Sequence, residues 1–521
     1  MVNLRGTLSF ALPAAVALGA LGAAPGDGNA APKKGKDAVK DLPCALADTV
    51  RPGDGATLRS AIGEALAAPD LEGVKIGALV KDLATGEVLF ALNPDVALHP
   101  ASNMKILTSA AALHYLGPAY RFSTTIYFKP DDRTGAKLAG ALYLKGGGDP
   151  RLTTEELHKV ADEIALAGIT EVTGGLVIDQ SFFDAGRLAP GYDEDPEEDH
   201  AFRAMSTAAA LNFNALALDV RPSPLGAGAP AVVRPMPASS YVEVEGSVAT
   251  LEAGKPTRLK VECAAEKDHD KCAVSGSIGA DGEPERAYRR VSNPSLHLAT
   301  ALWEMLEARG VKVSHKLREG AVPGAARELY RHKSDQLGAL VRDMNKVSSN
   351  FMAEQILRTI GAEVKGVGSW AAGIEAVREW VTTLGVPAGA ITMVNGSGLF
   401  GAPRVAPAHF VKVLEAVARD FTIAPDFVAS LAIASADGTI KGRMGDCGAA
   451  KVLRAKTGTL DDVTALSGYV AGPGGELVAF SILMNDVPVG KLGKLWAAQD
   501  QIGASIAAYL AKPALRSASK D

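Results

Sequence analysis

A serine and a lysine three residues apart could form a nucleophile and its base. At Ser102 and Lys105, small and polar residues give way to an apolar run, which predicts a helix from Ser102 to Leu116 with Ser102 at its N-terminus. Positions i and i+3 share a helix face, so Lys105 is expected beside the Ser102 hydroxyl. Serine is a poor nucleophile until a neighbour takes its proton, and burial beside other cations can lower a lysine pKa enough for that task. The alternative is a helix cap beside a solvated lysine, and the pattern alone is loose because Ser517 and Lys520 repeat it.

A second polar pair, Ser348 and Asn350, could move a proton and hold a substrate amide. Ser348-Ser349-Asn350 is the only Ser-x-Asn in the sequence, and a helical run, 351–360, follows it. The alternative is again a helix cap, because serine and asparagine are both favoured there.

A third motif, Lys456 to Thr459, could bind an anionic group along a strand. It contains the only Lys-Thr-Gly in the sequence and leads into two alternating strands within 464–484. Lys456 can hold a carboxylate, Thr457 can donate to it, and Gly458 leaves room for a ligand to pair along the strand edge. A plain β-turn is the alternative.

Together, and in this order, the three motifs form the active-site signature of penicillin-binding proteins and serine β-lactamases. More specifically, the sequence resembles the D-alanyl-D-alanine carboxypeptidase/endopeptidase family of class C low-molecular-mass penicillin-binding proteins, the penicillin-binding protein 4 type. The resemblance runs from roughly residue 55 to 510. Beyond the three motifs, it rests on 100–122, Leu142 to Pro150, Asn395 to Leu399 and Asp437 to Thr439.

This resemblance implies two groups of site residues. The catalytic group comprises Ser102, Lys105, Ser348, Asn350 and Lys456. The substrate-binding group comprises Thr457, Gly458, Thr459, Asp149 and Ser397.

The resemblance also implies a role for each catalytic motif. Ser102 would be the acylated nucleophile and Lys105 its general base. Ser348 and Asn350 would relay a proton and orient the substrate. The backbone N–H groups of Ser102 and Thr459 would form the oxyanion hole.

One position has a second interpretation, and two depart from the family pattern. Asp149 could meet the amine of the peptide stem, or could simply be a turn residue before Pro150. Ser349 stands where relatives usually have Asp, and Asn395 stands where Asp is common. Neither departure removes a reacting group, although either could alter rate or stem-peptide preference.

The implied fold is α/β (α+β), a β-lactamase/transpeptidase-like domain with inserted β-rich domains. Ser348 follows Ser102 by 246 positions, far more than a compact site requires. We expect the transpeptidase-like domain in two parts, 45–118 and 325–515. Between them, 119–324 would form two β-rich domains, one nested in the other.

The start of the chain has the pattern of a signal peptide, residues 1–30. Arg5 is followed by an apolar stretch, 8–24, and then by small residues suited to cleavage. A short membrane anchor is the alternative. A polar linker, 31–44, follows, and 516–521 form a tail. The expectation is an exported, periplasmic protein with no stable membrane insertion after signal removal.

The four cysteines, Cys44, Cys263, Cys272 and Cys447, allow three disulfide pairings. In an oxidising compartment Cys263 and Cys272 could bridge two strands, leaving the other two as a pair. A zinc site is the competing interpretation, but no CxxC and no His pair at ligand spacing favours it. We expect neither a metal nor another cofactor.

Composition narrows the partners further. The 521 residues include 54 Lys and Arg against 59 Asp and Glu, a net charge of −5, which gives no footprint for nucleic acid. The expected partners are peptidoglycan stem peptides and β-lactam antibiotics.

Two competing functions remain. A β-lactamase would need a deacylating base, but the sequence has neither an ExxLN segment nor a YxN motif. An inactive binding relative would not need all five catalytic residues. The sequence therefore predicts a serine-type D-Ala-D-Ala carboxypeptidase that could also cut crosslinks.

Overall fold

The computed structural model describes residues 44–193 and 199–511. The predicted signal peptide 1–30, the linker up to residue 43 and the tail 516–521 lie outside these ranges. Within them, no helix combines the length and apolarity needed to cross a membrane.

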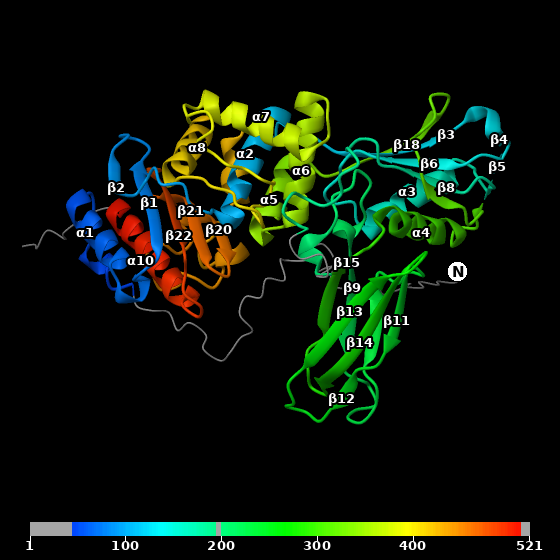
Figure 1. Cartoon of the computed structure of the whole chain (residues 1–521), viewed down its shortest axis with the longest axis horizontal. Coiled ribbons are helices and arrows are strands. Elements are labelled where there is room, and N and C mark those ends of the chain that lie inside the picture. The colour runs from blue at the N-terminus through cyan, green and yellow to red at the C-terminus, as the bar shows by residue number, and fades with distance from the viewer. Residues whose placement is uncertain (1–43, 194–198, 512–521) are drawn as a thin grey trace, which may run out of the picture.

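One antiparallel sheet combines strands from both ends of the chain (Figure 1). Its order is β19-β20-β21-β22-β1-β2. The six strands are β1 (Lys75–Asp82), β2 (Val88–Leu92), β19 (Ala432–Ile433), β20 (Leu453–Leu460), β21 (Val463–Ala471) and β22 (Leu477–Asn485). β1 pairs with β22 along its whole length, which joins the two ends of the described chain in one sheet.

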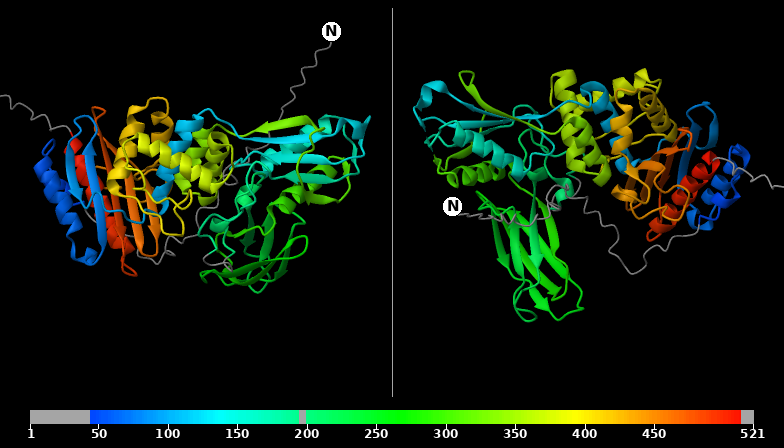
Figure 2. Two further views of the ribbon diagram at one scale, coloured as in Figure 1. Left: turned by 45° about the horizontal axis from the view of Figure 1, so that its top comes forward. Right: turned by 180° about the vertical axis from the view of Figure 1, so that it is seen from behind.

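Helices cover both faces of this six-stranded sheet (Figures 1 and 2). On one face lie α1 (Gly55–Leu66) and α10 (Leu492–Leu510). On the other lie α2 (Met104–Leu116), α5 (Leu337–Val347), α6 (Asn350–Lys365), α7 (Trp370–Thr383), α8 (Pro407–Arg419) and α9 (Ala424–Ser430). Successive side chains of a strand point to opposite faces of the sheet. In β21, Leu466 and Val470 therefore join the core under α10, whereas Ala465 and Tyr469 join the core under α2 and α8.

The middle of the chain builds separate sheets. A five-stranded sheet has the order β17-β8-β6-β3-β18, and a smaller one has the order β16-β7-β5-β4. Their strands are β3 (Ser123–Phe128), β4 (Arg133–Thr134), β5 (Lys137–Leu138), β6 (Leu142–Gly146), β7 (Glu171–Val172), β8 (Leu176–Asp179), β16 (Lys312–Val313), β17 (Leu317–Glu319) and β18 (Arg327–Lys333). α3 (Thr154–Leu166) and α4 (Pro294–Glu307) share an apolar core with the larger sheet. Because β18 pairs with β3, this sheet continues past residue 324.

A further β-rich part extends away from the rest of the molecule (Figure 2). One sheet has the order β10-β9-β15, and in the other β14 pairs with β11, β12 and β13. The strands are β9 (Ala215–Arg221), β10 (Val232–Met236), β11 (Val242–Gly246), β12 (Ala249–Leu251), β13 (Arg258–Ala265), β14 (Asp270–Gly279) and β15 (Glu285–Arg290). The two sheets share one apolar core.

Two disulfides resolve the pairing that the sequence left open. Cys263 and Cys272 face each other across β13 and β14, and Cys44 is joined to Cys447. The second bridge spans 403 positions, so it ties the start of the described chain to the loop before β20.

Removing the long-range bridge should measurably destabilise the protein. We expect Cys44→Ala/Cys447→Ala to lower the free energy of unfolding by about 2–5 kcal/mol, because the disulfide restricts the unfolded chain. Denaturant unfolding of the oxidised protein measures this, with Cys263→Ala/Cys272→Ala as the short-loop comparison. An unchanged unfolding midpoint for the Cys44/Cys447 variant would contradict the expectation.

Candidate active site

Ser102 lies on a tight turn that leads into α2, and Lys105 lies in the first turn of that helix. Residues Ala101–Asn103 form a 3-10 turn, and Ser102 is partly exposed while Lys105 is fully buried. Lys105 Nζ donates to Ser102 Oγ over 2.9 Å. The lysine is therefore beside the hydroxyl, where the i, i+3 spacing predicted it.

The loop after α7 packs closely against the backbone of this turn. Ala101 has φ +46°, a left-handed conformation unusual for a residue with a side chain. A Cβ on Gly398 would come within 2.1 Å of the Ala101 carbonyl oxygen, so only glycine fits there. Asn103 Nδ2 also donates to Ser467 Oγ of β21 over 2.7 Å, which fixes the turn to the sheet.

Two further acceptors surround the Lys105 amine. Its Nζ donates to Asn350 Oδ1 over 2.6 Å and to the Ser397 carbonyl over 3.1 Å. Neither an amide oxygen nor a carbonyl can donate a proton in return. A neutral Lys105 can therefore donate its two N–H groups to these acceptors and turn its lone pair toward Ser102.

Ser348 and Asn350 stand between two helices. Ser348 ends α5 with φ +59° in the left-handed region, and Asn350 begins α6. Ser349 caps α6, since its side chain accepts from Met352 N. Ser349, which was noted above as a departure from the family pattern, is thus a favoured capping residue.

The Lys-Thr-Gly motif lies within β20. Lys456 is fully buried and its Nζ donates to Ser348 Oγ over 2.8 Å. Thr457 Oγ1 donates to Thr439 Oγ1 over 2.8 Å. A Cβ on Gly458 would lie 2.6 Å from the Pro100 carbonyl oxygen, so the glycine lets β20 approach the Ser102 turn.

The outer edge of β20 is open next to the motif. Strand β19 pairs with β20 only at Arg454 and Ala455. Within the described ranges, no strand pairs with that edge at Thr457 to Thr459, which leaves room for an extended ligand.

Ser397 contacts the cluster through its backbone. Its side chain is fully buried, and its Oγ lies 3.0 Å from the Tyr192 hydroxyl and donates to Asn395 Oδ1. The carbonyl, by contrast, accepts from Lys105. A contact of the Ser397 hydroxyl with substrate stays a prediction.

Asp149 lies in a different cluster. It follows β6, is only 2% exposed, and accepts from Arg151 N over 2.9 Å. Burial raises the pKa of Asp149 to about 7. No hydrogen bond of this residue reaches Ser102 or Lys105, so its predicted contact with the stem amine stays untested.

The surroundings of Asp149 contain possible cation ligands. Single ligand atoms of Asp149, Glu156 and His332 lie within 4.8 Å of one another, the one such group in the described ranges. Carboxylates and imidazole can bind a divalent ion. The cluster is separate from the hydrogen bonds around Ser102.

Two polar residues that support the site had no assigned role in the sequence analysis. Glu354 accepts from the backbone N–H groups of Gly396 and Ser397, and Thr439 accepts from Thr457. Glu354 is four residues after Asn350, so helical spacing alone could have suggested it.

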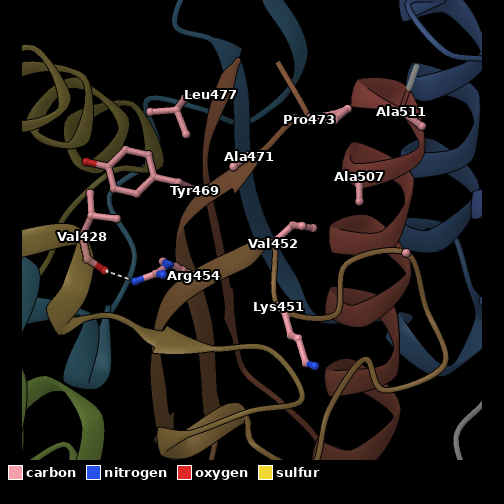
Figure 3. A pocket seen from close by; sticks show the side chains of 12 residues that line it. Val428, Lys451, Val452, Arg454, Tyr469, Ala471, Pro473, Leu477, Ala507 and Ala511 are labelled. Carbon is pink, nitrogen blue, oxygen red and sulfur yellow. Dashed lines mark hydrogen bonds between the residues drawn. The ribbon is translucent and has the colours of Figure 1, made fainter. Parts of the chain in front are cut away.

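A cavity lies near the opposite end of β20 and β21 (Figure 3). It encloses about 460 Å³ and is lined mainly by apolar residues such as Val452 and Leu477, with Lys451 and Arg454 as its two cations. None of the residues predicted for the site lines it. The cavity is therefore distinct from the Ser102 cluster.

Three features define the class of penicillin-recognising serine enzymes. They are a nucleophile-base pair at the start of a helix, a Ser-x-Asn between helices and a Lys-Thr-Gly on an antiparallel sheet. Comparison with known proteins gives the family. The model of the D-Ala-D-Ala carboxypeptidase 3 (S13) family matches residues 58–505. The chain belongs to this family, as its sequence motifs predicted, and it is a serine-type D-Ala-D-Ala carboxypeptidase.

Individual relatives agree with this assignment. The D-alanyl-D-alanine carboxypeptidase of Actinomadura sp. (strain R39) is 35% identical over 464 residues, covering 87% of this chain and 85% of the relative. The D-alanyl-D-alanine carboxypeptidase DacB of Haemophilus influenzae is 26% identical, covering 81% and 87%.

A solved structure shows the same fold. The crystal structure of penicillin-binding protein 4 from Haemophilus influenzae aligns with a TM-score of 0.72 at 24% identity, over 85% of this chain and 98% of that one. That protein has also been solved with a bound β-lactam. The predicted α/β, transpeptidase-like fold class is confirmed.

Proposed function

We propose that this carboxypeptidase removes the terminal D-alanine of peptidoglycan stem peptides through an acyl-enzyme on Ser102. The observation that carries the proposal is the set of contacts at Lys105 Nζ, with Ser102 Oγ at 2.9 Å and two non-donating acceptors beside it. This arrangement suits a base that takes the serine proton as the hydroxyl attacks.

In the acylation step the Ser102 proton moves to the Lys105 amine. The Ser102 oxygen bonds to the carbonyl carbon of the penultimate D-Ala, and the negative charge falls on the carbonyl oxygen. Backbone N–H groups of Ser102 and Thr459 would stabilise that charge. Because β20 is open at its outer edge, the substrate backbone can pair beside Thr459.

The C–N bond then breaks and the leaving amine needs a proton. Ser348 is suited to pass its proton to the amine and to take one from the Lys456 ammonium, whose Nζ donates to its Oγ over 2.8 Å. D-Alanine leaves. Water then attacks the Ser102 ester: its hydroxyl frees the shortened stem, its proton restores the Lys456 ammonium, and Lys105 returns the first proton to the Ser102 oxygen. No metal ion takes part in this scheme.

Release of free D-alanine from a stem-peptide mimic tests the function. Mature protein incubated with a diacylated L-Lys-D-Ala-D-Ala should release D-alanine continuously, in an amount that comes to exceed the amount of enzyme many times. A well-folded protein that binds the peptide but releases none would favour the inactive binding relative instead.

Thr457 provides a specific test of carboxylate binding. We expect Thr457→Val to lower kcat/KM about 10- to 100-fold, mostly through KM, because a hydrogen bond to a charged group contributes about 1.5–3 kcal/mol. The loss should vanish for a substrate whose terminal carboxylate is amidated. Thr134→Val is the matched control, since Arg133-Thr134-Gly135 repeats the pattern on an exposed hairpin. Equal losses on both substrates would contradict the assignment.

Two further activities follow from the same acylation chemistry. β-Lactams present a reactive amide to the serine, so they are expected to acylate Ser102 and leave slowly. The acyl-enzyme could also form from D-Ala-to-diaminoacid crosslinks, which would make the protein an endopeptidase. Conversion of purified crosslinked muropeptide dimers to monomers distinguishes the two activities.

We place the protein in the periplasm. The signal-peptide pattern of residues 1–30 supports export, and the two disulfides, Cys44–Cys447 and Cys263–Cys272, favour an oxidising compartment. We also keep the proposal of inserted domains between the two parts of the transpeptidase-like domain, with their end after β18, at residue 333 rather than 324, because β18 pairs with β3. It is supported by sheets that share no strand with the six-stranded sheet.

A further inference from the structure

Glu354 is a buried carboxylate one helical turn after Asn350. Residues i and i+4 share a helix face, so both side chains of α6 point toward the same region. Glu354 is 1% exposed, and burial raises the pKa of its carboxyl. Three N–H groups nevertheless donate to it, which favours the ionised form because a carboxylate only accepts.

Those three donors fix the loop after α7. Ser397 N donates to Glu354 Oε1 over 2.8 Å, and Gly396 N donates to Oε2 over 2.9 Å. Trp370 Nε1 donates to the same Oε2 over 2.9 Å. The loop is held from its other side by Thr108 Oγ1, which donates to the Gly396 carbonyl over 2.7 Å.

The backbone of Ser397 connects Glu354 with Lys105. The Ser397 N–H is held by Glu354, and the Ser397 carbonyl accepts from Lys105 Nζ over 3.1 Å. α6 therefore acts on two acceptors of the lysine: it carries Asn350 Oδ1, and through Glu354 it holds the loop residue whose carbonyl is the other.

We propose that Glu354 is a positioning residue that holds the Ser397 carbonyl in place, and thereby aims the Lys105 lone pair at the Ser102 hydroxyl. The inference rests on the proposed function, in which Lys105 is the base. Without Glu354 two adjacent buried N–H groups lose their acceptor and the loop shifts, because unsatisfied buried donors are costly. A displacement of about 1 Å in a catalytic geometry can cost 10²-fold in rate.

The charged and titratable groups around this hydrogen-bonded set give the direction of a pH effect. They are Glu354 on α6, the Arg358 guanidinium one turn further along α6, the Tyr192 hydroxyl on Ser397, and Lys456 on Ser348. Glu354 is the one carboxylate among these groups, and the N–H groups that donate to it favour its ionised form. Replacing Glu354 with a neutral side chain removes a negative charge and loosens the Ser397 carbonyl, an acceptor of Lys105. Both changes disfavour the ammonium form of Lys105. The acidic limb of the rate profile should move to lower pH.

The test is Glu354→Gln in the full mature protein. The second-order rate constant for acylation by benzylpenicillin is measured between roughly pH 5 and 10, per active site counted by titration. We expect the plateau to fall about 10- to 100-fold and the acidic limb to move to lower pH. Glu363→Gln is the matched control on the same helix, where an exposed carboxylate accepts only from the Tyr120 hydroxyl, and it should leave the profile unchanged.

The outcomes separate this inference from the proposed function. If the wild type is active and the Glu354→Gln profile keeps the wild-type plateau and acidic limb, the role of Glu354 is overturned while the proposed function stands. A lower thermal midpoint with an unchanged profile per active site also overturns it, because that result shows a merely structural residue. If the wild type itself forms no Ser102 adduct, the proposed function fails first.

A second variant covers the case in which Glu354→Gln does not fold. Glu354→Asp keeps the charge but shortens the side chain, so the plateau should fall while the acidic limb stays near that of the wild type. A wild-type plateau in Glu354→Asp would overturn the proposal.

Discussion

Replacing Ser102 with alanine should abolish covalent labelling by a fluorescent penicillin and reduce D-alanine release by at least about 10⁴-fold. The reason is that the acyl group has no other oxygen to bond to at this position. Lys105 Nζ would keep its contacts with Asn350 Oδ1 and the Ser397 carbonyl, so the fold and non-covalent binding should persist. Gel fluorescence and a D-alanine assay measure both effects.

The tail offers a matched control for this experiment. Ser517 begins the second Ser-x-x-Lys in the sequence, and Ser517→Ala should label and turn over like the wild type. A labelled band of normal intensity in Ser102→Ala would show that the nucleophile lies elsewhere.

Removal of the proposed base should have the second largest effect. We expect Lys105→Met to lower the rate constant of penicillin acylation by about 10²- to 10⁴-fold, the usual contribution of a general base. Methionine fills much of the space of the fully buried lysine stem, so loss of packing is kept small. Stopped-flow acylation gives the rate, and thermal unfolding checks that the variant is folded.

A charged replacement separates base chemistry from simple electrostatics. Lys105→Arg keeps the positive charge but cannot lose its proton, so it should be as slow as Lys105→Met. Lys520→Arg in the tail motif is the control and should behave as the wild type. Acylation by Lys105→Arg at the wild-type rate would contradict the assignment of Lys105 as base.

The sequence could predict those parts of the site that local spacing determines. The i, i+3 relation of Ser102 and Lys105 requires only a helix, and the structure has their side chains 2.9 Å apart. The meeting of Lys456 with Ser348 depends on tertiary packing between β20 and the end of α5. Only the order of the motifs in a known family made that contact predictable.

The sequence was least informative where burial decides what a side chain does. Asp149 follows a glycine-rich segment that matches the family, but its carboxylate is buried with Glu156 and His332 rather than bonded to the serine cluster. Ser397 likewise has a buried hydroxyl and reaches Lys105 through its carbonyl. No pattern of residue types distinguishes a backbone contact from a side-chain contact.

In the fold, too, local patterns were predictable and long-range pairings were not. The helix after Ser102 and the strands near 464–484 have clear apolar periods, and the structure has α2, β21 and β22 there. The pairing of β1 with β22 and of β18 with β3 joins segments distant in sequence, which periodicity does not encode. The disulfide pairing is of the same kind, because four cysteines allow three arrangements.

The most direct test of the central claim is to locate the acyl group by mass spectrometry. The mature protein is mixed with benzylpenicillin, quenched in acid, digested and analysed by tandem mass spectrometry. The account predicts a single adduct with the mass of the intact penicillin on the peptide that contains Ser102, with fragment ions assigning it to that residue. An adduct on another residue, or none on a folded protein that still releases D-alanine, would contradict an acyl-enzyme at Ser102.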